Sequence, residues 1–389
     1  MQADADVRAV TAKIAGDYNS VPYKPLSKGS PGLDPALLFG IAGVYGDFPM
    51  RKDLDVLDLG CGSGGQLLRL GGLTTGRIVG VDISRVACDD AVKQCKPLGS
   101  RCTIHCADLL DFDIATLGQF DLIYLLGVYF VVPDAVQKRL LEVIATCLKP
   151  GGVAVISYYT GEVWRQYAGM RTAVHAVADR TTAPAAQIKA ARRALQDMAA
   201  APGQKALTTR LITHALAGDE TALFHEMMGE VHAHATTTTF EDALAPAGIH
   251  FLNWLQPGPF GSPDPKARAA TADRGSQGGY LYGVFGKYDP ALPADWSRIS
   301  WITGLRRAGA STYGIPVFRD TAASGTVEVM NSSTAAALDV LARGPVPWTD
   351  IQNALAAQPA GLAYLAAVKR DFLTYWQAGQ LTPLAQGTS

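Results

Sequence analysis

The sequence has no excess of charge of either sign. Its 389 residues carry 34 basic and 35 acidic side chains, for a formal net charge of −1. Proteins that bind nucleic acid through its phosphates normally show a basic patch or stripe. The composition gives no electrostatic reason to expect a nucleic-acid partner, and we predict none.

Long apolar runs and paired cysteine motifs are also missing. The longest apolar run covers residues 122–132, which is too short to cross a bilayer. The six cysteines form no C-x-x-C pair and all lie within residues 61–147, as expected for reduced structural thiols. The first residues show neither the basic start nor the apolar centre of a signal peptide. We therefore predict a cytoplasmic protein with no bound metal and no membrane partner.

Glycine is concentrated where an apolar strand pattern meets a turn. Residues 55–65 read DVLDLGCGSGG, and a helical pattern follows. Glycine has no Cβ and tolerates positive φ, so such a turn lets a nucleotide-like ligand approach the backbone. Gly60, Gly62 and Gly65 also match the G-x-G-x-x-G spacing of a dinucleotide site. Asp58 argues against that alternative, because a carboxylate repels a pyrophosphate but accepts hydrogen bonds from an ammonium group.

Two further acidic residues follow the ends of predicted strands. Asp82, with Ile83 after it, closes a strand pattern about 20 residues beyond the glycine turn, which suits the two hydroxyls of a ribose. Asp108 closes the next pattern and suits an adenine amino group, while Leu109 suits the ring. These residues predict a nucleoside site at the carboxyl ends of three strands.

A fourth strand pattern covers residues 119–129, and a fifth covers residues 148–159 after a Lys-Pro-Gly-Gly turn. We expect the end of the fourth strand, from Gly127 to Tyr129, to lie over the reacting part of the ligand. In this order the five landmarks resemble the class I S-adenosylmethionine-dependent methyltransferases over residues 55–159. The resemblance implies S-adenosylmethionine as cofactor; a doubly wound domain that binds another nucleoside is the alternative.

The rest of the chain predicts the fold. Residues 163–235 show helical patterns, and strand signals return in residues 240–254 and 279–288, with a polar loop over residues 262–278. We expect an α/β fold with a Rossmann-like seven-stranded mixed sheet, a helical insertion between strands 5 and 6, and a mainly helical, winged-helix-like C-terminal domain. The predicted units are an N-terminal lid segment (1–50), a methyltransferase core (51–164 and 236–288), a helical insertion concerned with substrate or regulation (165–235) and the C-terminal domain (289–389). The last domain suits packing or dimerisation, so a homodimer is possible.

Three shorter segments narrow the resemblance. They are YNSVPY (residues 18–23), GVYFVVP (residues 127–133) and LFHEM (residues 223–227) with Phe240 downstream. They resemble elements of bacterial methyltransferases that carry a methyltransferase regulatory domain, some of which are protein lysine methyltransferases. Phe130 and Val131 replace the Ser and Trp that this group usually has after its Gly-Val-Tyr. The resemblance implies a protein lysine as methyl acceptor.

Candidate catalytic residues are few. Tyr129 is the first candidate to lie near the transferred methyl, and an aromatic wall against the cofactor is its alternative role. His225 and Glu226 are candidates for a base or a substrate anchor, although a histidine in an apolar helical run is often structural. Tyr18 and Tyr23 are expected to form a lid over the cofactor.

The acceptor itself stays open at this point. An aromatic basin is predicted from Phe130, Tyr158, Tyr159 and Trp164, with Glu226 beside it. The first hypothesis is transfer to an amine of a protein or peptide. The second is a small-molecule O-, N- or S-methyltransferase of a biosynthetic pathway, and the third is a cofactor-binding scaffold without turnover. Fold alone does not choose among them.

Overall fold

A seven-stranded mixed sheet forms the centre of the protein. The computed structural model describes residues 2–23, 34–46, 48, 51–255, 264–275, 278–291, 295–312, 314–321, 326–357 and 365–386. The strand order is β3-β2-β1-β4-β5-β7-β6. The strands are β1 (Val56–Leu59), β2 (Ile78–Asp82), β3 (Cys102–Cys106), β4 (Phe120–Leu125), β5 (Leu148–Thr160), β6 (Ile249–Trp254) and β7 (Gly278–Lys287). The first five run parallel, and β7 lies antiparallel between β5 and β6. The predicted Rossmann-like fold is confirmed.

Helices cover both faces of this sheet, so the central strands are buried on both sides. Val56 and Leu122 belong to one core cluster, whereas their chain neighbours Leu57 and Ile123 belong to the other. This alternation follows from the two-residue period of a strand, and it explains why the strands read as continuous apolar runs. The flanking helices are α2 (Pro35–Gly43), α3 (Gly65–Gly71), α4 (Arg85–Gln94), α5 (Asp134–Cys147), α10 (Thr237–Leu244) and α11 (Pro265–Gly275). Short 3-10 turns are η1 (Lys96–Arg101), η2 (Ile114–Leu117), η3 (Tyr129–Val131), η4 (Ala245–Ala247) and η5 (Trp296–Arg298).

The helix α11 corrects the prediction of a polar loop over residues 262–278. Arg268 of this helix is fully buried. Its guanidinium donates to the main-chain oxygen of Phe251 on β6 and to the hydroxyl of Tyr288, and it lies over the Tyr45 ring. The sequence pattern was misleading because a buried arginine makes a core-facing helix look polar.

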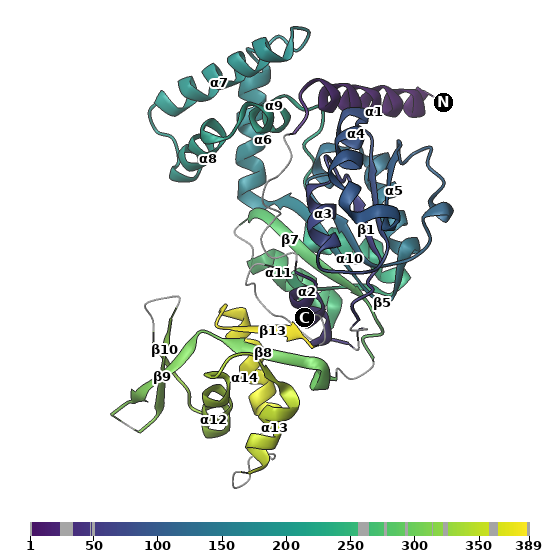
Figure 1. Cartoon of the computed structure of the whole chain (residues 1–389). Helices are drawn as coiled ribbons and strands as arrows, with labels where there is room; N and C mark the ends of the chain where they lie inside the picture. Colours follow the sequence, from purple (N-terminus) through teal and green to yellow (C-terminus); the bar gives the residue numbers. More distant parts are fainter. Residues whose placement is uncertain are drawn as a thin grey trace.

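The insertion between β5 and β6 consists of four helices that stand away from the sheet (Figure 1). They are α6 (Gly161–His175), α7 (Pro184–Ala200), α8 (Ala206–Ala217) and α9 (Glu220–Met228). Their mutual contacts form a separate apolar cluster, which includes Met170, Leu195 and Met227. The insertion therefore has a small core of its own and still borders the carboxyl edge of the sheet.

The N-terminal helix α1 (Gln2–Ser20) lies across this edge, beside α4 and the insertion (Figure 1). Arg8 pairs with Asp111 beyond β3, and the Asn19 side chain accepts from the hydroxyl of Ser84 at the start of α4. Lys13 pairs with Glu230 just after α9. The helix is thus attached on both sides, and it continues as far as Ser20.

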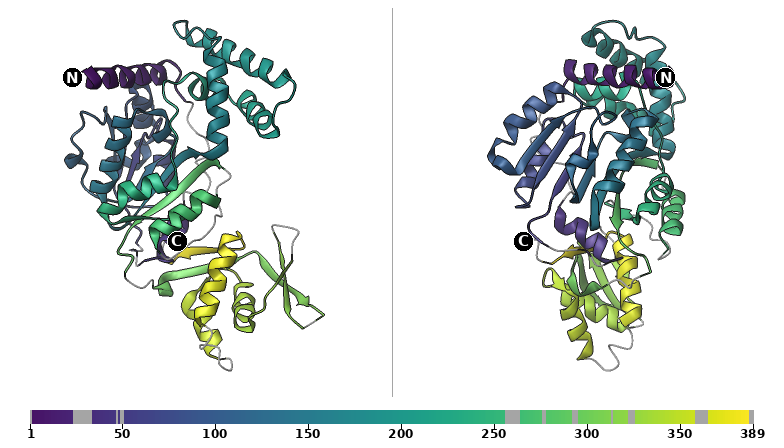
Figure 2. Two further views of the ribbon diagram at one scale, coloured as in Figure 1. Left: turned by 180° about the vertical axis from the view of Figure 1, so that it is seen from behind. Right: turned by 90° about the vertical axis from the view of Figure 1, so that its right-hand side faces the viewer.

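The C-terminal unit lies on the opposite side of the sheet from the insertion (Figure 2). Its helices are α12 (Ser332–Leu341), α13 (Trp348–Ala356) and α14 (Leu365–Gln377). Its strands are β8 (Ile299–Thr303), β9 (Leu305–Ala310), β10 (Pro316–Asp320), β11 (Thr326–Glu328), β12 (Val346–Pro347) and β13 (Leu381–Ala385), which form two three-stranded sheets. The three helices agree with the mainly helical domain expected from the sequence, but the two sheets were not anticipated.

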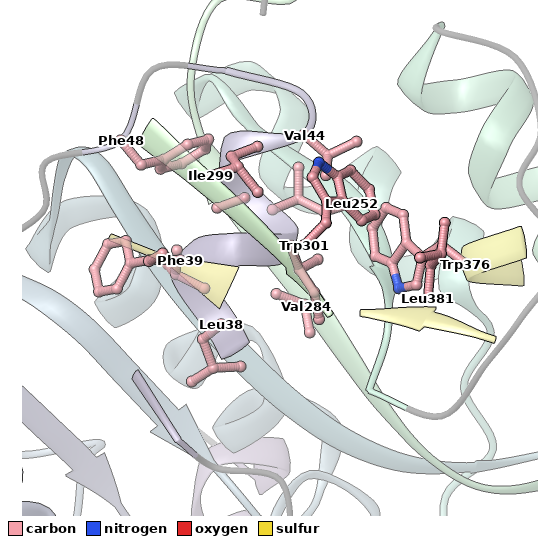
Figure 3. Packing of buried hydrophobic residues seen from close by; sticks show 14 of the residues in the cluster. Leu38, Phe39, Val44, Phe48, Leu252, Val284, Ile299, Trp301, Trp376 and Leu381 are labelled. Carbon is pink, nitrogen blue, oxygen red and sulfur yellow. The ribbon is translucent and has the colours of Figure 1, made fainter. Parts of the chain in front are cut away.

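The C-terminal unit shares a core with the central sheet through α2. Figure 3 shows Trp301 and Leu381 of this unit close to Val284 and Leu252 of the sheet. A Cβ on Gly40 of α2 would lie 2.3 Å from the main-chain oxygen of Pro383, so only glycine permits this approach. The unit is therefore tightly packed on the sheet, far from the carboxyl ends of the strands.

Candidate active site

A cavity of about 420 Å³ lies at the carboxyl ends of the parallel strands. This is where open α/β sheets bind their ligands, and the volume is typical of a small-molecule site. The cavity brings together thirteen of the predicted site residues: Tyr18, Tyr23, Asp58, Gly60, Gly62, Asp82, Ile83, Asp108, Leu109, Gly127, Phe130, His225 and Glu226. It has two parts. We call the part at Asp58, Gly62, Asp82 and Asp108 the glycine-turn side, and the part at Tyr18, Tyr23, Glu226 and Tyr280 the tyrosine side.

The glycine turn after β1 accepts no larger residue at its first position. Gly60 has φ +80°, and a Cβ there would lie 2.2 Å from a methyl group of Val128. Gly62 has φ +51°, and its amide donates to a carboxylate oxygen of Asp82 over 2.8 Å. The turn is thereby fixed over the end of β2 and exposes bare backbone to the cavity.

Asp58 is a buried carboxylate on the glycine-turn side. Burial and the nearby Asp82 raise its pKa to about 7. Among the residues that the structure describes, none hydrogen-bonds this carboxylate. Burial of an unpaired carboxylate is costly, so the position favours a ligand that brings a positive charge.

Asp82 and Asp108 are better supported by the chain itself. Asp82 accepts from the amides of Gly62 and Ser84, and Asp108 accepts from the amide of Leu110 over 2.9 Å. These bonds fix both carboxylates at the strand ends. Both groups line the cavity and present oxygen acceptors to it, with Leu109 as an apolar neighbour.

Glu226 provides a second buried carboxylate, on the tyrosine side. One of its oxygens, Oε2, is buried without a hydrogen-bond partner in the described part of the chain. Burial raises the pKa of Glu226 to about 7, against the opposing effects of the Arg171 charge and the Tyr159 hydroxyl. Its negative charge in turn raises the pKa values of Tyr18, Tyr23 and Tyr280 beyond the effect of their burial. The three phenols line the same cavity as this carboxylate.

Basic side chains of α6 and its following loop hold the end of α9, and so fix Glu226. Arg171 donates to the main-chain oxygens of Glu226 and Gly229, and the His175 ring bonds the main-chain oxygen of Met227. Cations at a helix C-terminus interact favourably with the helix dipole. Burial lowers the pKa of Arg171 to about 10, so it remains charged at neutral pH.

His225 joins α9 to the end of α1. Its ring stacks on Tyr18 at 4.0 Å between centroids, and Tyr23 lies at 5.1 Å on the same ring. Its Nε2 bonds the main-chain oxygen of Val21 over 2.7 Å and therefore carries a proton. Burial lowers the pKa of His225, so the ring is neutral. This geometry supports a positioning role, in which His225 holds the two tyrosines over the cavity.

The placement predicted for Tyr129 is wrong. The strand β4 ends at Leu125, and Tyr129 lies in the following turn η3. Its ring packs edge-on against Phe240 at 4.7 Å, within the core cluster that contains α5 and α10. It does not line the cavity.

The placement predicted for Tyr158 is also wrong, because alternation along β5 turns it away from the cavity. It is fully buried, and its hydroxyl bonds Thr237 over 2.8 Å and accepts from Trp254 over 2.9 Å. Its neighbour Ser157 points to the cavity side instead. Its Oγ accepts from the Gly127 amide over 2.7 Å.

Tyr159 and Trp164 lie outside the cavity lining, behind the tyrosine side. Tyr159 packs edge-on against Phe130 at 4.8 Å between ring centroids. From that position its hydroxyl opposes the rise in the pKa of Glu226. Trp164 donates to the main-chain oxygen of His232. Both residues support the wall instead of facing a substrate.

Tyr280 and Tyr282 of β7 are among the cavity residues that the sequence analysis did not select. They are two positions apart and so share one face of the strand. That spacing was a usable signal, but the sequence alone did not indicate which face of β7 meets the cavity.

The comparisons with known proteins agree with this geometry. Residues 56–152 match a family described as a methyltransferase domain. This segment is therefore similar to a methyltransferase domain, as the order of the strands predicts. Two uncharacterized proteins of Rickettsia prowazekii (strain Madrid E), RP789 and RP028, are each 32% identical over 157 residues, or 40% of this chain. The matched region covers 28% of RP789 and 61% of RP028, so it spans less than two thirds of either relative.

Solved structures of PKMT2 from Rickettsia typhi share the fold over 94% of this chain. One is 19% identical, with a TM-score of 0.68 and 77% of that chain covered. The other, in complex with AdoHcy, is 18% identical, with a TM-score of 0.69 and 78% covered. The similarity therefore extends through the insertion and the C-terminal unit, beyond the methyltransferase domain. Within the described residues, no helix has both the length and the apolar character required to cross a membrane.

The residues on the glycine-turn side fit S-adenosylmethionine, the cofactor that the resemblance implies. Asp58 offers an unpaired buried carboxylate to an ammonium group, and the backbone at Gly62 is open, since nothing lies within 4 Å of a Cβ built there. Asp82 and Asp108 offer fixed oxygen acceptors along the same edge.

Proposed function

We propose that the protein is an S-adenosylmethionine-dependent methyltransferase that transfers the methyl group to an amine of a protein or peptide, with a lysine side chain as the acceptor class. The carboxylate of Glu226 is the observation that carries the proposal, because it is buried, has one oxygen without a hydrogen-bond partner among the described residues, and shares its cavity with three phenols. A neutral hydroxyl or thiol acceptor brings no positive charge for this buried carboxylate to pair with.

On the glycine-turn side we assign the methyl donor's ammonium to Asp58 and its ribose to Asp82, with Ile83 beside it. Asp108 and Leu109 take the adenine, and Gly60 and Gly62 provide the open backbone. Tyr18 and Tyr23, which stack on His225, cover the cavity as a lid. The assignment rests on the partners and backbone geometry described above and on the resemblance to the family.

On the tyrosine side the acceptor amine meets Glu226. An ammonium group is attracted by a carboxylate and by the faces of aromatic rings, which here come from Tyr18, Tyr23 and Phe130. Before methyl transfer the ammonium must lose a proton, and a carboxylate with a pKa near 7 is suited to accept it at neutral pH.

The test is methyl transfer from isotope-labelled S-adenosylmethionine to a lysine-containing peptide library and to a metabolite extract. We expect label in the peptides. Glu226→Gln should lower kcat by about 100-fold, a typical contribution of a general base. Glu220→Gln, on the exposed face of the same helix, is the matched control and should retain activity.

Two outcomes contradict the proposal. Label that appears only in metabolites would favour the small-molecule alternative. Donor binding without label in either pool would favour a scaffold.

A further inference from the structure

A chain of three hydrogen-bonding groups connects β4, β5 and β7 at the edge of the cavity. The Gly127 amide, just after β4, donates to the Ser157 hydroxyl over 2.7 Å. The Ser157 hydroxyl in turn shares a hydrogen bond of 2.8 Å with the hydroxyl of Tyr280 on β7. Ser157 is fully buried, so the middle of this chain is shielded from solvent, whereas Gly127 and Tyr280 line the cavity.

The Tyr280 oxygen lies at the position where the sequence had placed Tyr129. It is 3.9 Å from the Cβ position of Gly127, at the carboxyl end of β4, and both residues line the cavity. The Tyr280 ring packs against Phe130, and burial together with the negative charge of Glu226 raises the pKa of its phenol. It therefore lies at the end of β4 and shares the cavity with the proposed proton acceptor.

We propose that Tyr280 is a catalytic residue whose phenol oxygen accepts a hydrogen bond from the acceptor nitrogen and directs its lone pair to the methyl carbon, and that Ser157 is the residue that positions this phenol. The inference rests on the proposed function, because it requires an acceptor that bears N–H groups. A single fixed acceptor of this kind orients an amine while a second group removes the proton.

The step balances with these residues. When bound, S-adenosylmethionine supplies a methyl carbon that leaves its sulfur as a C–S bond breaks. The acceptor ammonium first gives one proton to the Glu226 carboxylate, and the freed lone pair forms the N–C bond. The product is a methylammonium ion, and Glu226 later releases its proton to solvent. Tyr280 stays protonated throughout, which agrees with the raised pKa that burial gives it.

The experiment compares Tyr280→Phe, Ser157→Ala and the double variant in the full chain. We expect Tyr280→Phe to lower kcat for a lysine peptide by about 10- to 100-fold, a size typical of one well-placed hydrogen bond. The dissociation constant for S-adenosylmethionine, measured by calorimetry, should stay within about twofold. Ser157→Ala should lower kcat in the same direction and should have a smaller further effect in the Tyr280→Phe background. Most of its action passes through the Tyr280 hydroxyl, and the remainder is the lost bond to the Gly127 amide.

Tyr158→Phe is the matched control, since it removes a buried hydroxyl from β5 on the other side of the sheet. The inference would be overturned if Tyr280→Phe had the same kcat as this control. It would also be overturned if the double variant lost as much kcat as the product of the two single losses, because the two residues would then act independently. These results differ from a failure of the proposed function, in which the unmodified protein transfers no methyl group to any amine.

Discussion

The two sides of the cavity are built from different kinds of chain segment. The glycine-turn side comes from residues 58–108, where successive strands end at one edge of a parallel sheet. The tyrosine side combines residues from α1, α9 and β7, which are as far apart in the sequence as Tyr18 and Tyr280. The first depends on local turns, whereas the second depends on how distant elements pack. A cofactor site of this kind can stay constant while the acceptor site changes.

Each side nevertheless holds one buried carboxylate whose pKa is raised to about 7. At Asp58 the nearby Asp82 adds to the effect of burial, whereas at Glu226 the charge of Arg171 opposes it. Under the proposed function each carboxylate binds a different cation. Asp58 binds the ammonium group of the methyl donor, and Glu226 binds the ammonium group of the acceptor.

The largest effect that separates the two sides is expected for Asp58→Asn. The change removes the charge that we assign to the ammonium of the methyl donor, so the dissociation constant for S-adenosylmethionine should rise by about 100-fold, or roughly 2.8 kcal/mol. Calorimetry on the purified protein measures it. Glu226→Gln should leave the same constant within a few-fold. Equal losses in both variants would show that the two sides form one undivided site.

A smaller effect concerns the stability of the unliganded protein. Burial raises the pKa of Glu226 from 4.5 to about 7, so between these pH values the folded chain holds a proton that the unfolded chain has lost. Stability therefore falls as pH rises through this window. Glutamine carries no charge, so Glu226→Gln removes the cost of burying the ionised carboxylate. The free energy of unfolding of this variant should exceed that of the unmodified protein by about 1 to 3 kcal/mol at pH 8, with little difference at pH 4.5. Urea unfolding at both pH values measures the difference.

Glu230→Gln is the control of opposite sign. Lys13 and Arg180 pair with Glu230 and, against the effect of burial, lower its pKa, so its charge stabilises the folded chain above the unfolded pKa. That variant should be less stable at pH 8 and nearly unchanged at pH 3. Destabilisation by both variants at pH 8 would mean that Glu226 has a partner in solution.

The two sides of the cavity also differ in how well they could be predicted from the sequence. The strands of the sheet could be predicted from their apolar runs and from the resemblance to a family. The site residues of the glycine-turn side could be predicted because they follow the ends of those runs: Asp58, Gly62, Asp82 and Asp108. The tyrosine side is only partly readable. Tyr18, His225 and Glu226 were selected through the resemblance to a family. Tyr280 was missed, because the face of an antiparallel strand depends on its pairing register, which the sequence does not state.

The smallest expected effect is that of Tyr129→Phe, which tests the correction made by the structure. The residue ends no strand, and its ring contributes packing against Phe240 within the core. Phenylalanine keeps that ring and loses only the hydroxyl, so kcat and the donor dissociation constant should both stay within about twofold. Single-turnover kinetics with the lysine peptide measure kcat. A loss as large as that expected for Tyr280→Phe would mean that η3 rearranges when the acceptor binds, and that the phenol near the methyl carbon comes from the end of β4 after all.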